Sequence, residues 1–124
     1  MFAQRTHPDR ELFERLEGLS QEAKAERLEC ASLLTNTLIA TLQRYDVPSA
    51  PSGFLTVDGW FNLLGQWEII LQSSTARQID FSRSFFQDVL KRPAFNVPPL
   101  SPLLTGLVTL MANHSESLHS RVAA

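Results

Sequence analysis

The chain has 124 residues, a formal net charge of −2, and 44% hydrophobic residues. This length suits one domain, and the near-neutral charge argues against direct nucleic-acid binding, which normally requires a basic stripe. The sequence contains no apolar segment of about 20 residues and no signal-peptide pattern, so we expect no membrane contact and a cytoplasmic location.

The charges are distributed unevenly along the chain. Of the 24 charged residues (11 Lys and Arg, 13 Asp and Glu), 12 fall within residues 1–29. After Arg92 only Glu116 and Arg121 are charged. We therefore expect the N-terminal end to be solvated and the poorly charged helices to be covered by other protein surface.

Two helices are predicted in the first 45 residues. The first runs from Thr6 to Gly18, because a threonine can cap it, a proline follows, and a glycine can close it. The second runs from Ser20 to Tyr45 and is uncharged over Cys30–Gln43, with apolar residues at helical spacing. We expect this long helix at the centre of the domain, at the seam of a homodimer, or both. The predicted seam residues are Leu34, Leu38, Leu42 and Tyr45.

A breaker segment at residues 46–55 contains two prolines, two serines and a glycine, and it predicts a loop. Thr56 then caps a third helix that reaches about residue 71. Four large apolar residues, spaced four, three and four apart, follow one face of this helix: Trp60, Leu64, Trp67 and Leu71. Other apolar residues surround this stripe, so the helix is hydrophobic on more sides than a single core contact requires.

Two further helices complete the prediction. The fourth starts between Thr75 and Asp80 and ends at Arg92, because a proline follows. The last begins at Ser101, which can cap a helix whose first residue is a proline.

The fold class predicted from these elements is all-α. We expect a single domain over residues 1–124, built as a four- to five-helix bundle with one long central helix, and dimeric. Residues 1–5 and 120–124 are expected to be frayed.

The sequence carries no pattern typical of an enzyme or a metal site. His114 and His119 are five residues apart and so lie on different faces of a helix. Cys30 is the one cysteine, which excludes an intramolecular disulfide, and we expect it to be a buried thiol. A small helical enzyme for anionic metabolites needs a basic clamp, but the central helices offer few charges: Arg44, Asp58 and Glu68. We expect a non-enzymatic protein without cofactor or metal.

The remaining signal is apolar and aromatic surface, which is typical of the centres of protein interfaces. We expect a protein that captures another protein through an apolar helical surface, as a regulator, inhibitor or anti-activator, adaptor or chaperone. Core packing is the alternative interpretation of each residue. The predicted protein-binding residues are Trp60, Phe61, Leu64, Trp67, Phe81 and Phe85.

Two other functions fit the same pattern. The chain could be a structural or assembly subunit whose apolar faces are permanently covered in a larger complex. It could also be a small-molecule sensor, with an aromatic pocket between the helices over Trp60–Leu71 and Leu103–Leu118.

Overall fold

A computed structural model describes residues 8–45, 56–97 and 100–123, without the side chains of residues 8, 9, 45 and 119–123. In this part of the chain every regular element is a helix, which confirms the all-α prediction. The predicted loop at 46–55, the Thr6 cap and the predicted frayed residues 1–5 lie outside the described residues. The five helices are α1 (Pro8–Ala25), α2 (Glu29–Tyr45), α3 (Val57–Gln72), α4 (Ala76–Leu90) and α5 (Leu100–Ala123).

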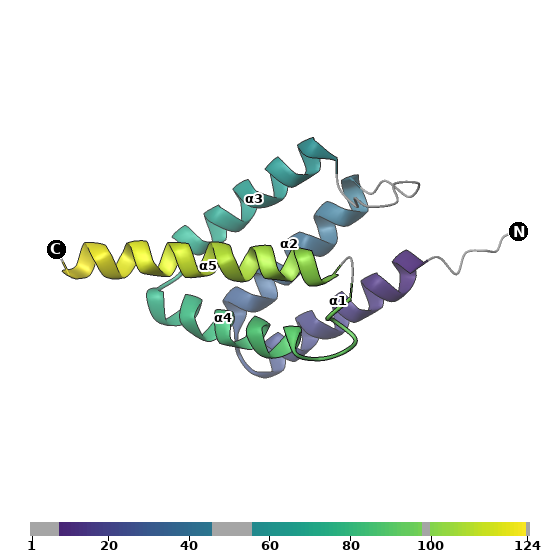
Figure 1. Ribbon diagram of the computed structural model, residues 1–124, viewed down its shortest axis with the longest axis horizontal. Helices are drawn as coiled ribbons and strands as arrows, with labels where there is room; N and C mark the ends of the chain where they lie inside the picture. Colours follow the sequence, from purple (N-terminus) through teal and green to yellow (C-terminus); the bar gives the residue numbers. More distant parts are fainter. Residues whose placement is uncertain (1–7, 46–55, 98–99, 124) are drawn as a thin grey trace, which may run out of the picture.

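The helix at the centre of the bundle is α2, which contacts α1, α3 and α4, while α5 packs on α4 (Figure 1). It has only 17 residues, so the prediction of one long central helix from Ser20 to Tyr45 is wrong. Residues 20–25 instead form the last turns of α1, which runs through Gly18 without a break. Gly18 is exposed, and a side chain there would meet no other atom within 4 Å.

The true break between the first two helices is a tight turn at Arg27. The backbone N–H of Leu28 donates to the Ala23 carbonyl at 2.8 Å, and that of Arg27 donates to the Lys24 carbonyl at 2.9 Å. This pair of bonds is the Schellman motif at the end of α1. In this motif the residue directly after the C-cap has a left-handed backbone conformation. That residue is usually glycine, but here it is Arg27, with φ of 62°. Because position 27 is not a glycine, the residue type did not predict the end of α1 at this turn.

The buried side of α2 accounts for part of the uncharged stretch from Cys30 to Gln43, although Leu33 and Asn36 within it are exposed. Leu34 and Leu38 are completely buried, and Leu42 is almost so. Polar residues on this helix bond to its own backbone, since the hydroxyl of Thr35 donates to the Ala31 carbonyl at 2.9 Å. Helix α2 can therefore pack against three other helices without leaving its two buried threonines, Thr35 and Thr41, unsatisfied.

The starts of α3 and α4 follow the sequence prediction closely. Thr56 is the N-cap of α3, and its hydroxyl accepts a hydrogen bond from the backbone N–H of Gly59 at 3.0 Å. At α4, Thr75 and Gln78 form a reciprocal capping box, with bonds of 3.1 and 2.8 Å. Both helices therefore begin where a threonine satisfies free N–H groups.

The last helix, α5, is the longest, with 24 residues. It begins at Leu100, one residue before the predicted cap, and its backbone is helical to Ala123, where we expected fraying.

Among the described residues, no helix is both long enough and apolar enough to cross a membrane.

One ion pair connects two distant parts of the chain, α1 and the turn after α4. The guanidinium of Arg92 donates two hydrogen bonds to the Glu22 carboxylate, at 2.8 and 2.5 Å. These bonds, more than the simple attraction of the charges, lower the pKa of Glu22 below its ordinary value of about 4.5 and raise that of Arg92. Both side chains are partly exposed, at 34% and 42%, so solvent screening limits the stabilisation.

The substitution Arg27→Gly is expected to raise the free energy of unfolding. Glycine adopts a positive φ without the steric cost that arginine meets, and the gain should be about 1 kcal/mol. Chemical denaturation measures it. Arg27→Ala is the control, because it removes the side chain but keeps the steric cost. If Ala stabilises the chain as much as Gly, backbone conformation is not the cause.

The Glu22–Arg92 pair predicts a specific dependence of stability on pH. A carboxyl with a lowered pKa in the folded state stabilises the fold above its unfolded pKa, and that stability disappears as the pH falls through the folded pKa. Glu22→Gln should therefore lower the free energy of unfolding by less than about 1 kcal/mol at pH 7. The difference from the unmodified chain should shrink as the pH falls below 4.5.

Denaturation curves at several pH values between 3 and 7 test this dependence. Glu14→Gln is the matched control, since Glu14 pairs with Arg10 within one helix and both side chains are highly exposed. It should change stability little at any pH. A destabilisation by Glu22→Gln that stays the same from pH 7 to pH 3 would contradict the assignment.

Candidate interaction surface

The largest group of exposed apolar side chains in the described part of the chain belongs to α3. It contributes four of the seven large hydrophobic residues that are exposed there. Phe61 and Val57 are each 70% exposed, and Ile69 is 64% exposed. Isolated exposed hydrophobics are ordinary, but several on one helix mark a contact surface. Three of these residues lie four and three apart on one side of the helix, and we call them the α3 face: Val57, Phe61 and Leu64. Ile69, five residues after Leu64, is exposed on a different side.

The opposite side of α3 fixes the direction in which this face points. Trp67 is completely buried, and its indole N–H donates to the Leu34 carbonyl of α2 at 3.0 Å. Leu63 and Leu71, one turn away on either side, are also completely buried. Rotation of α3 about its axis would break the indole hydrogen bond, so Phe61 and Ile69 remain directed to solvent.

The six predicted protein-binding residues do not form one surface. Phe61 and Leu64 are exposed on α3, and Trp60 is half-buried against the core. Phe81 is 57% exposed but lies on α4. Trp67 and Phe85 are buried, and the ring of Phe85 packs edge-on against Phe86 with centroids 5.3 Å apart. These last two are core residues, which leaves them no surface to offer a partner.

The predicted dimer seam also lies inside the chain. Leu34, Leu38 and Leu42 are buried by neighbouring helices, because α2 is enclosed by α1, α3 and α4. Tyr45 ends α2, and its side chain lies outside the described residues. A second copy would therefore have to bind through another surface.

One residue of the α3 face, Val57, and the exposed Ile69 are absent from the predicted site. The sequence stripe through Trp60, Leu64 and Trp67 suggested one face, but the buried line runs through Gly59, Leu63 and Trp67 instead. The difference is a small rotation of the helix, which moves Leu64 from the core to the surface. The spacing of Val57, Phe61 and Leu64, four and three apart, was a usable signal for a second stripe.

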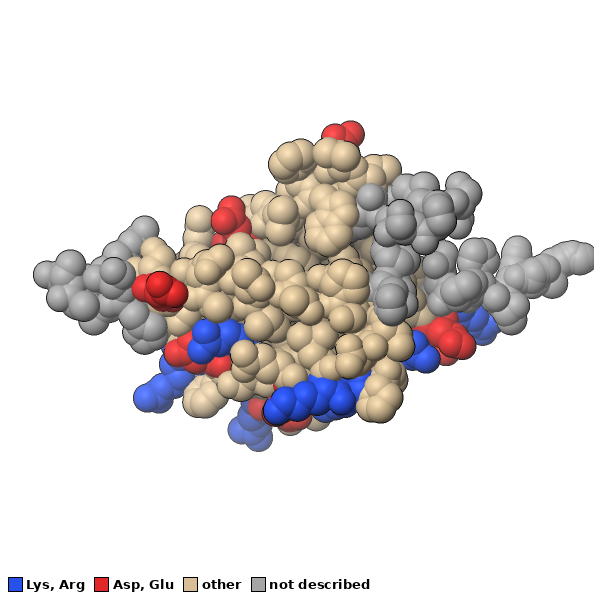
Figure 2. Space-filling view, in the orientation of Figure 1, with Lys and Arg blue, Asp and Glu red and all other residues tan. Residues whose placement is uncertain are grey.

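The charge on helix α3 itself is purely acidic. Helix α3 contains Asp58 and Glu68 and no Lys or Arg, and neither carboxylate makes an ion pair with a described residue. In Figure 2 the Lys and Arg atoms lie along the lower side of the molecule, over α4 and α1, and none is visible over α3 at the top. Red and uncharged atoms make up the described surface there.

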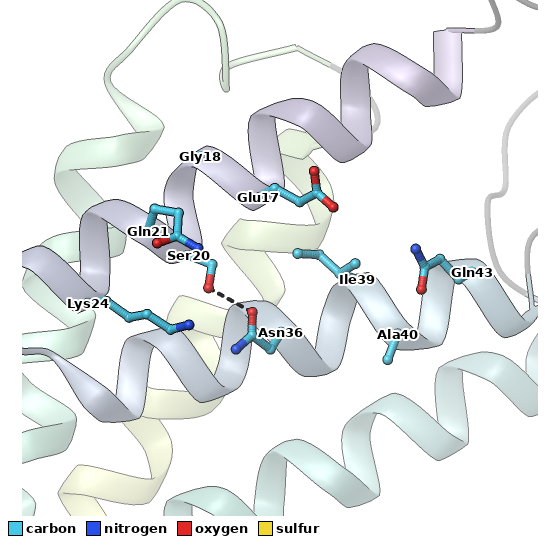
Figure 3. A pocket seen from close by; sticks show the side chains of 9 residues that line it. All are labelled: Glu17, Gly18, Ser20, Gln21, Lys24, Asn36, Ile39, Ala40 and Gln43. Atoms are coloured by element: carbon cyan, nitrogen blue, oxygen red, sulfur yellow. Dashed lines mark hydrogen bonds between the residues drawn. The ribbon is translucent and has the colours of Figure 1, made fainter.

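A second feature is an open polar groove between α1 and α2, with a volume of about 610 Å³ (Figure 3). Its floor holds a hydrogen bond of 2.7 Å from the Ser20 hydroxyl to the side-chain oxygen of Asn36. Glu17 and Lys24 stand on the α1 side, and Gln43 on the α2 side. A neighbouring hollow of about 680 Å³ shares Lys24 and Asn36 with it. The groove offers hydrogen-bonding groups but no nucleophile activated by a base.

Side chains that could bind a metal ion or act as nucleophiles are not grouped together in the described part of the chain. No three His, Cys, Asp or Glu residues there are grouped closely enough to hold a metal ion. Cys30 is free and buried as predicted, and its sulfur accepts a hydrogen bond from the Ser74 hydroxyl at 3.4 Å. Asp80 accepts a hydrogen bond of 2.7 Å from Ser115, which ties α4 to α5.

Comparison of the chain with protein-family models, with curated proteins and with solved structures finds no match.

The burial of the predicted seam leads to a test with a matched pair of substitutions. Leu38→Glu places a carboxylate in a completely buried site and should cost at least about 3 kcal/mol, enough to unfold much of the chain. Leu33→Glu changes the same residue type on the same helix at a position that is 46% exposed, and it should remain folded. Circular dichroism on heating distinguishes the two. If the unmodified chain is a dimer and the Leu38→Glu variant is a folded monomer, the interpretation of α2 as a dimer seam is restored.

Proposed function

We propose that this protein is a non-enzymatic interaction protein that captures another protein through the α3 face. The observation that carries the proposal is the exposure of Val57, Phe61 and Leu64 on one side of a helix whose other side is anchored in the core. Burying a large side chain such as that of Phe61 in a partner would contribute roughly 1.5–3 kcal/mol. A few such residues supply most of the affinity of a typical interface.

The arrangement of the face supports this function better than a structural role within the monomer. At a solvent-exposed helix position, a polar residue would maintain the fold equally well, since little packing is lost. The phenyl ring of Phe61 makes its stabilising contribution only when another surface covers it. We further propose that the captured protein is regulated, inhibited, adapted or chaperoned by this contact, in the cytoplasm.

Phe61→Ala is expected to abolish capture of the partner and to leave folding intact. Affinity purification from a lysate of the source organism, followed by mass spectrometry, identifies the proteins that are retained. Truncating a central aromatic anchor typically costs 2 kcal/mol or more, or roughly 30-fold in affinity. The thermal midpoint should change little, because Phe61 is 70% exposed.

Phe81→Ala is the matched control, since it removes the same side chain at an exposed position on α4. It should retain the partner. If both variants retain the same proteins, or if Phe61→Ala unfolds the chain, the α3 face is not the capture surface. If the unmodified chain is soluble only together with its partner, it is a permanent assembly subunit rather than a regulator.

A further inference from the structure

We propose that the α3 face binds an amphipathic helix of the partner whose apolar stripe is flanked by lysine or arginine. This inference rests on the proposed function and specifies the chemistry of the partner. It is carried by two independent observations, the spacing of the exposed side chains and the sign of the charges beside them.

The spacing of the exposed side chains is that of a helix-pairing seam. Val57, Phe61, Leu64 and Glu68 follow one another at intervals of four, three and four residues, and all four are exposed. This interval is the heptad pattern, in which side chains of one helix insert between those of a second helix lying alongside. Gly65 lies next to this row, is exposed, and has no atom within 4 Å of where a side chain would be. A second helix can approach closely at that point.

The charges determine which kind of helix fits. Glu68 continues the apolar row by one turn, and Asp58 lies in the first turn of α3. Neither has a basic partner among the described residues. A partner helix that covers the row brings its own flanking residues next to these carboxylates. Lysine or arginine there pairs with them, whereas aspartate or glutamate is repelled.

The same charges disfavour a second copy of this chain as the occupant. If two α3 helices pair in antiparallel fashion around Phe61 and Leu64, Glu68 of one copy comes near the first turn of the other, where Asp58 lies. If they pair in parallel, each carboxylate faces its own equivalent. Either arrangement gathers four carboxylates, and α3 provides no base to neutralise them.

Two synthetic helical peptides test the proposal. Both carry leucine at the heptad a and d positions; one has lysine at the flanking e and g positions, and the other has glutamate there. We expect the purified chain to bind the lysine peptide at least tenfold more tightly than the glutamate peptide, measured by fluorescence anisotropy. Raising the salt concentration from 50 to 500 mM should reduce this preference, because exposed charges are screened.

Four variants of the chain locate the binding. Phe61→Ala should weaken binding of the lysine peptide at least tenfold, whereas Phe81→Ala should change it less than twofold. Glu68→Gln should reduce the preference for lysine over glutamate about threefold. Glu17→Gln is its control, since it makes the same change in net charge at an exposed position on α1.

The outcomes separate this inference from the proposed function. If both peptides bind equally and Phe61 is still required, the charge inference is overturned and capture through the α3 face stands. If neither peptide binds, or if Phe61→Ala does not weaken binding, the inference also fails. The proposed function fails as well if, in addition, Phe61→Ala captures the same proteins from the lysate as the unmodified chain. If sedimentation shows a dimer that Phe61→Ala dissociates, a second copy occupies the face and the inference is wrong.

Discussion

The hydrogen bond between the Trp67 indole and the Leu34 carbonyl determines how α3 is set against the rest of the molecule. Trp67 is the largest of the completely buried side chains, and its one polar group must find an acceptor inside the core. A helical carbonyl has a second lone pair, so Leu34 can accept this bond in addition to its place in the α2 backbone ladder. The bond fixes the rotation of α3, and the residues on its outer side are exposed as a consequence.

The second constraint is the enclosure of α2 by three helices. A helix in that position cannot carry charge on its buried faces, and it uses serine and threonine for its polar positions. The serine hydroxyl at residue 20 spans the α1–α2 contact to Asn36, and a threonine hydroxyl bonds to the backbone one turn earlier. The low charge of the sequence therefore has at least two sources. Part of it reflects this enclosed helix, and part reflects the apolar outer side of α3, which the monomer leaves uncovered.

The sequence was sufficient to predict the starts of α3 and α4, which threonine side chains mark. Thr56 and Thr75 act locally, through hydrogen bonds to free backbone N–H groups, so their effect can be recognised without the fold. The end predicted at Arg92 lies two residues beyond the observed end of α4 at Leu90. The end of α1 could not be predicted, because Arg27 adopts a conformation that its residue type disfavours and that the packing of the helix hairpin imposes. The core side of α3 was also ambiguous, because the helix has apolar residues almost all round. The choice between its faces depends on contacts with α2, among them the acceptor for the Trp67 indole, which is 33 residues away.

The buried thiol of Cys30 gives the molecule an internal reporter. It is the single cysteine, it is 5% exposed, and it lies under the turn between α3 and α4, where Ser74 donates to its sulfur. A thiol reagent reaches it more readily when that turn lifts from the start of α2. When opening is fast, the rate of modification under native conditions is the intrinsic reactivity of the thiol multiplied by the fraction of time the sulfur is accessible. The native Cys30 thiol can thus report local opening at the end of α3, the helix that carries the exposed apolar face.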